Sequence, residues 1–75
     1  MSQTLQFTAV IEREGDGYFA LCPELDVASQ GQTIEEARSN LIEALELFLE
    51  AADPTEIEIR LKSEVLITRV EVEVG

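Results

Sequence analysis

The chain has no histidine and no tryptophan, and its 75 residues include a single cysteine, Cys22. Without histidine there is no imidazole to serve as a general base or to complete a Ser–His or Cys–His nucleophile pair. One cysteine cannot form an internal disulfide and offers no zinc-binding spacing, and in an apolar run we expect its thiol to be buried and unreactive. We therefore expect no catalytic residue, no metal ion and no cofactor in this protein.

Positive charge is also scarce, because five Lys and Arg residues face 16 Asp and Glu residues, for a formal net charge of -11. Direct binding of nucleic acid depends on a basic patch, and the five cations form no cluster in the sequence. We expect no direct contact with nucleic acid. An acidic surface can serve solubility or dock on a basic partner, and composition alone leaves both open.

Long apolar runs are missing as well. No stretch reaches the roughly 18 residues that a membrane span requires, and residues 1–4 lack the basic start of an export signal. The unpaired cysteine is consistent with a reducing compartment, so we expect a cytoplasmic protein without membrane contact. A chain this short removes only about 60% of its unfolded surface from water, which favours a homodimer or a higher homo-oligomer.

What is present begins with three short strand patterns. Residues 4–13 alternate between apolar and polar, which predicts a strand with one apolar face. Residues 15–17, Gly-Asp-Gly, favour a tight hairpin. Residues 18–22 are apolar on both sides, so the second strand should be central, and Pro23 ends it because proline has no N–H. After a turn, residues 28–32 form a short third strand.

The second half of the chain predicts helices and a last strand. Thr33 and Glu36 have the spacing of a capping box that opens a helix over residues 34–52. Its apolar and acidic faces separate almost completely, and Leu47 alone lies among the acids, either as a lone exposed leucine or as a contact to a second chain. Residues 53–56 have the capping aspartate, proline and glutamate that typically start a helix, whereas the alternation of apolar and charged residues over 57–61 is typical of a strand. We favour a short helix over residues 54–61. Residues 65–74 are rich in β-branched side chains and alternate between apolar and polar, which predicts a final strand. The apolar positions change from odd to even numbers near residues 68–69, which indicates a bulge.

These elements predict one α+β domain over residues 1–75. Its expected order is strand, strand, strand, helix and strand. A three-stranded antiparallel meander is joined by a helix and a final strand, so that one helix layer covers one face of a four-stranded sheet. The other face or a strand edge is then left for a partner.

The Gly-Asp-Gly turn, the Cys22-Pro23 step and the capping box occur in an order and spacing that closely resemble the HicB-like antitoxin domain of type II toxin–antitoxin systems, in its short UPF0150-like form. The resemblance covers residues 5–52 or so. It implies a partly degraded ribonuclease H-like fold. It also implies that the signature residues mainly preserve that fold; they are Gly17, Cys22, Pro23, Gly31, Thr33, Glu36 and Asn40.

HicB proteins neutralise HicA toxins, which are small basic proteins that cleave mRNA, by covering the toxin's active site and RNA-binding surface. The resemblance therefore implies a non-enzymatic antitoxin whose partner is a HicA-type toxin. Many HicB antitoxins carry a C-terminal DNA-binding domain, and we expect none in a chain that ends at Gly75. The candidate partner-binding residues are exposed acids, the loop around the Cys-Pro turn and one leucine: Asp16, Glu24, Asp26, Glu43, Glu46, Leu47 and Glu50.

Two alternatives belong to other functional classes. One is an orphan module of the same fold that forms oligomers and has no toxin partner. The other is a divalent-metal-dependent nuclease, which needs several carboxylates around paired Mg²⁺ ions. The centre of the first strand, residues 7–10, contains no acid, so we disfavour the nuclease. The identity of the protein encoded next to this one separates the first two interpretations.

Overall fold

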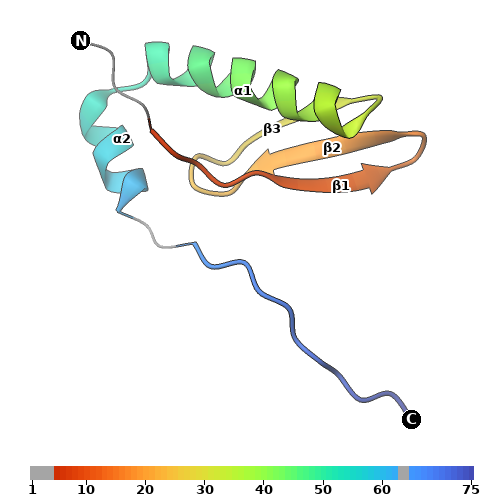
Figure 1. Cartoon of the computed structure of the whole chain (residues 1–75). Coiled ribbons are helices and arrows are strands. Elements are labelled where there is room, and N and C mark those ends of the chain that lie inside the picture. The colour runs from red at the N-terminus through yellow and green to blue at the C-terminus, as the bar shows by residue number, and fades with distance from the viewer. Residues whose placement is uncertain (1–4, 63–64) are drawn as a thin grey trace.

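Three antiparallel strands and one long helix form the two layers of the domain in the computed structural model, which describes residues 5–62 and 65–75 (Figure 1). The strands are β1 (Val10–Glu14), β2 (Gly17–Cys22) and β3 (Val27–Gly31), in the order β1-β2-β3. Helix α1 (Ile34–Ala51) crosses one face of the sheet, and α2 (Pro54–Leu61) lies at the end that carries the β2–β3 turn. The predicted α+β class, the meander and the central position of β2 are confirmed.

The hairpin between β1 and β2 sets the register of the sheet. Gly15 has φ 59, and Asp16 does not have a positive φ, which is the pattern of a type II′ turn. Val10 therefore pairs with Leu21, and Glu14 pairs with Gly17. Because side chains alternate along a strand, this register directs Ala20 and Cys22 toward α1.

The first strand is shorter than predicted. It begins at Val10, and residues 5–9 are not part of the ladder; residue 4 lies outside the described residues. The reason is Pro23, which follows the last residue of β2 and has no N–H to continue the pairing. Instead, the backbone N–H of Thr8 donates to the carboxylate of Glu24, at 2.9 Å and 3.1 Å to its two oxygens.

Both helices begin at the caps that the sequence predicts. Glu36 N–H donates to Thr33 Oγ1 at 3.0 Å, and the Glu36 carboxylate accepts from Gln32 N–H at 3.1 Å, one residue before the usual position. Thr55 N–H donates to Asp53 Oδ1 at 2.7 Å at the start of α2. The short helix favoured over residues 54–61 is confirmed, because the capping aspartate and Pro54 outweigh the strand-like alternation.

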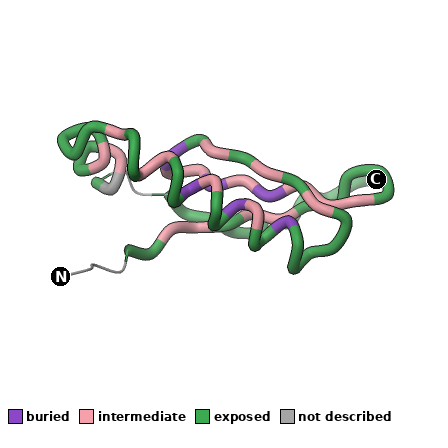
Figure 2. Tube along the Cα trace, turned by 90° about the horizontal axis from the view of Figure 1, so that it is seen from above, coloured by how far each residue is buried: buried purple, intermediate pink, exposed green. Residues whose placement is uncertain are grey.

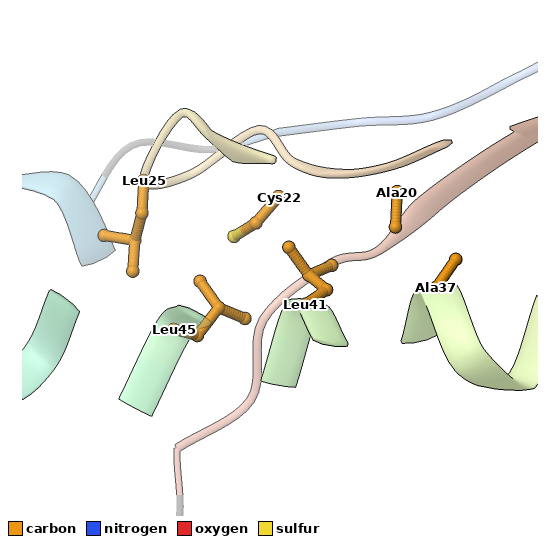
Figure 3. Close-up of a cluster of buried hydrophobic side chains, with 6 residues drawn as sticks. All are labelled: Ala20, Cys22, Leu25, Ala37, Leu41 and Leu45. Atoms are coloured by element: carbon orange, nitrogen blue, oxygen red, sulfur yellow. The ribbon is translucent and has the colours of Figure 1, made fainter. Parts of the chain in front are cut away.

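The core lies between α1 and β2 and is small. In Figure 2 the buried positions lie in the central part of the molecule, away from α2. Figure 3 shows the Cys22 sulfur pointing toward α1, as the prediction of a buried thiol requires. The buried hydrophobic side chains are Ala20, Cys22, Leu25, Ala37, Leu41 and Leu45.

The prediction of a fourth, final strand is wrong for the single chain. Residues 65–75 contain no strand and are exposed throughout, and the sheet formed by the described residues has three strands. The alternation of residues 65–74 is real, but alternation specifies only which residues share a face. A strand also needs an open edge beside it, and in Figure 1 this segment leaves the domain on the side of the sheet opposite α1.

Candidate functional site

The outer face of α1 brings four of the predicted partner-binding residues together. Glu46, Leu47 and Glu50 follow Glu43 by three, four and seven positions. This spacing places all four residues on one face of a helix. That face is opposite the buried residues Ala37, Leu41 and Leu45. All four side chains are exposed, and Leu47 is 60% exposed. We call this surface the acidic ridge; it consists of Glu43, Glu46, Leu47 and Glu50.

No cation among the described residues forms an ion pair with the acidic ridge. The last turn of α1 has no basic residue, and the one ion pair among the described residues, Arg60 with Glu56 at 3.4 Å, lies on α2. Carboxylates three and four positions apart repel each other by about 0.2–0.5 kcal/mol per pair. Glu50 also faces the negative end of the helix dipole. The ridge therefore retains negative charge at the expense of helix stability, as binding surfaces often do.

This cost predicts that removing the charge of Glu50 stabilises the protein. Glu50→Gln should raise the free energy of unfolding by about 0.3–1 kcal/mol, because it relieves repulsion from Glu46 and the unfavourable dipole interaction. Urea unfolding at neutral pH and low salt measures the change. Glu35→Gln is the matched control, because Glu35 lies in the first turn of α1 and its loss should be slightly destabilising. A decrease in stability for both variants would contradict the explanation.

Glu24 has a structural role that the sequence pattern did not reveal. Its carboxylate accepts two bonds from Thr8 N–H, one from Thr8 Oγ1 at 2.7 Å and one from the Cys22 thiol at 3.5 Å. Burial by itself raises the pKa of Glu24, but the hydrogen bonds from Thr8, from the backbone of Glu24 and from the Cys22 thiol together outweigh it and hold the pKa below its usual value. Burial also raises the pKa of the Cys22 thiol, so the thiol stays protonated. Glu24 fastens residues 5–9 to the β2–β3 turn.

The lowered pKa of Glu24 predicts a pH-dependent contribution to stability. The folded state favours the ionised carboxylate, so this contribution is complete near neutral pH and is lost as the pH falls below about 5. Glu24→Gln should therefore be less stable than wild type at pH 7, and the difference should shrink at pH 3. Urea unfolding at the two pH values measures it. Asp26→Asn at pH 7 is the control for removing a carboxylate from the same turn, because Asp26 makes no such contact in the described residues.

The other two predicted residues lie away from the acidic ridge. Asp26 is exposed in the β2–β3 turn with φ 55, so its backbone shapes the turn. Asp16 lies at the opposite end of the sheet, where it lines an open hollow of about 710 Å³ together with Glu14 and Glu36. No sequence pattern connects these two glutamates with Asp16, because they come together only when the hairpin meets the start of α1.

The described residues provide neither a metal site nor a membrane-spanning helix. Within residues 5–62 and 65–75, no group of three or more His, Cys, Asp or Glu side chains is arranged to hold a metal ion. In the same part of the chain, neither helix is long and apolar enough to cross a bilayer. The chemistry that the acidic ridge offers is therefore charge and a single exposed leucine.

Comparison with curated proteins places the chain in a family. It is 40% identical over 65 residues to a UPF0150 protein of Helicobacter pylori strain J99, and the match covers 85% of this chain and 90% of the relative. The chain belongs to the UPF0150 family. Two UPF0150 proteins of Synechocystis sp. are each 47% identical over shorter spans of 51 and 47 residues, which cover 65% and 60% of this chain and 65% of each relative. No family profile and no solved structure matches the chain.

The UPF0150 part of the predicted resemblance is thereby confirmed, and several signature residues have structural roles. A Cβ on Gly31 would lie 2.5 Å from Ala37 N, and a Cβ on Gly17 would lie 2.8 Å from Gly31 O. Asn40 Nδ2 donates to Gln30 O at 2.9 Å. These contacts join the hairpin, β3 and the first turns of α1, so the signature residues position the helix that carries the acidic ridge.

Proposed function

We propose that this UPF0150 protein is a HicB-like antitoxin of the cytoplasm, without enzymatic activity, that neutralises a small basic HicA-type toxin by protein–protein blockade. The observation that carries the proposal is the acidic ridge, where three carboxylates surround one exposed leucine and form no ion pair with a described cation. Complementary charge speeds the encounter of two proteins and orients them. The same charge repels RNA, so the ridge suits a protein surface that normally holds RNA.

The composition of the acidic ridge fits the interface of two proteins. Interfaces combine an apolar anchor with a polar rim, and here Leu47 provides the anchor while Glu43, Glu46 and Glu50 form the rim. The ridge lies on the side of α1 away from the sheet, so a partner can reach it without disturbing the core. The resemblance to HicB supplies the identity of the partner, and the ridge supplies the chemistry for binding it.

The experiment is co-expression with a small basic protein encoded beside this one. We expect a stoichiometric complex on size exclusion, and we expect the antitoxin to stop mRNA cleavage by the purified toxin. The control is the same assay with a variant whose three ridge carboxylates are replaced by lysine. If the neighbouring protein does not bind this chain and does not cleave mRNA, this chain is an orphan interaction module of the same fold.

A further inference from the structure

Residues 65–74, here called the C-terminal arm, have the composition of a strand but no strand beside them among the described residues of their own chain. The exposed fraction of the large apolar residues in the arm ranges from 36% at Val65 to 90% at Val74. After α2 the arm runs away from the domain, on the side of the sheet opposite α1 (Figure 1). An exposed, extended and apolar segment of this kind is prone to pair with another edge.

An open sheet edge lies elsewhere on the same domain. β1 pairs with β2 on one side and has no partner among the described residues on the other. Next to the start of β1, a largely apolar groove of about 690 Å³ runs between residues 5–9 and one side of α1. It remains open because α1 packs mainly over β3 and β2. The apolar residues that line the groove include Leu5, Phe7, Ile42, Leu45 and Leu49, and two charged residues, Arg38 and Glu46, line it as well.

We propose that the C-terminal arm of one copy pairs with the β1 edge of a second copy and fills this groove. The arm and residues 5–14 are equal in length, and each spans roughly 33 Å when extended. A bulge at residues 68–69 would bring the apolar residues before and after it onto one face. That face would enter the groove, while Glu71 and Glu73 point into solvent.

The direction of the arm favours a second copy as the occupant of the groove. In the single chain the arm diverges from its own β1 edge, which leaves both the arm and the groove without a partner among the described residues. Reciprocal exchange about a two-fold axis would satisfy both arms and both edges, so the assembly closes as a dimer. It would also add burial to a core that is small for a chain of this length. The homodimer expected from composition thereby acquires a defined interface, which meets the acidic ridge at Glu46 and leaves Glu43, Leu47 and Glu50 outside the groove.

Mixed-label NMR on the full-length protein tests the exchange directly. One half of the sample carries isotope label and the other half does not, and only contacts between copies are detected. We expect contacts from the methyl groups of Val70 and Val72 to those of Ile42, in a protein that sediments as a dimer. A monomer in sedimentation, or contacts confined to one chain, would overturn the proposal and show that the arm closes on its own domain or stays free.

Matched substitutions provide a second test. Ile42→Glu, at a groove residue that is 42% exposed, should weaken the dimer about ten-fold or more, because it places a charge in the apolar interface. Leu47→Glu makes a comparable change on the other face of α1 and should leave the dimer intact. If Ile42→Glu fails to fold, Val72→Glu is the deciding variant, because the arm lies outside the core and the substitution should leave the domain folded. We expect Val72→Glu to weaken the dimer and its control, Glu71→Gln, to leave the dimer intact. A dimer unaffected by Val72→Glu would refute the exchange.

These variants also separate the dimer from the proposed antitoxin activity. Val72→Glu should lose the dimer and still bind a basic toxin through the acidic ridge. Leu47→Glu should keep the dimer and lose affinity for the toxin. A failure of toxin binding would therefore leave the dimer test unchanged, and a failure of the dimer would leave the toxin test unchanged.

Discussion

Replacement of Glu43, Glu46 and Glu50 by lysine is expected to weaken binding of a basic HicA-type toxin about a hundred-fold. Each reversal removes an attraction and introduces a repulsion, worth about 1 kcal/mol per exposed site. Three such changes give about 3 kcal/mol, which corresponds to a factor of about a hundred in Kd. Surface plasmon resonance at low and high salt measures the effect. The wild-type affinity should fall as salt rises, and the variant should show little salt dependence.

A variant with the same change in net charge separates local from global electrostatics. Glu12, Glu58 and Glu71 are exposed and lie outside α1, so their replacement by lysine alters the total charge without touching the acidic ridge. We expect a moderate decrease in association rate and little change in dissociation rate. Equal losses for the two triple variants would mean that net charge alone attracts the partner and that the ridge has no particular role.

The acidic ridge on α1 could be predicted from the sequence, while the hollow that Asp16 lines could not. Glu43, Glu46, Leu47 and Glu50 belong to one helix, so the helical period alone determines that they share a face. The grouping of Asp16 with Glu14 and Glu36 depends on contact between the hairpin and α1, which no local pattern encodes. Local periodicity therefore identifies a surface on one element and misses a surface built from two.

Glu24 illustrates a second limit of sequence reasoning. An acid in a polar turn resembles any other exposed acid, so the sequence predicts that it contacts a partner. The structure instead places its carboxylate on the backbone and hydroxyl of Thr8, sixteen positions away. The underlying cause is visible in the sequence, because Pro23 ends the ladder and leaves the Thr8 N–H in need of an acceptor. Which side chain supplies the acceptor is decided by the fold.

The fold itself was predictable where a local signal starts or ends an element. Thr33, Glu36 and Asp53 are caps, and Gly15 fits the hairpin turn, so the bounds of the helices and the meander followed from them. The extent of the first strand and the fate of the C-terminal arm depend on whether an edge is available to pair with. That condition is set by tertiary or quaternary structure, and strand-like alternation in residues 5–9 and 65–74 carries no information about it.

The largest loss of stability from a single methyl group is expected at Gly31. Its Cβ would lie 2.5 Å from Ala37 N and 2.8 Å from the carbonyl carbon of Glu36, both of which are backbone atoms at the start of α1. Neither can move without separating the helix from β3. Gly31→Ala should therefore lower the free energy of unfolding by about 3 kcal/mol, which amounts to roughly 4–8 °C of Tm for each kcal/mol in a domain of this size.

Gly15→Ala is the control that distinguishes a steric cause from a conformational one. Gly15 has φ 59, and no described atom outside its own chain neighbours lies within 4 Å of the place that an alanine methyl group would occupy, so alanine there should cost only about 1 kcal/mol of backbone strain. Thermal and urea unfolding of the two variants should rank Gly31→Ala as clearly more destabilising. The Gly31 variant should also weaken toxin binding when folded, because the clash displaces the helix that carries the acidic ridge. A Gly31→Ala protein as stable as the Gly15→Ala protein would mean that β3 and α1 can separate freely, and the ridge would then have no fixed position relative to the sheet.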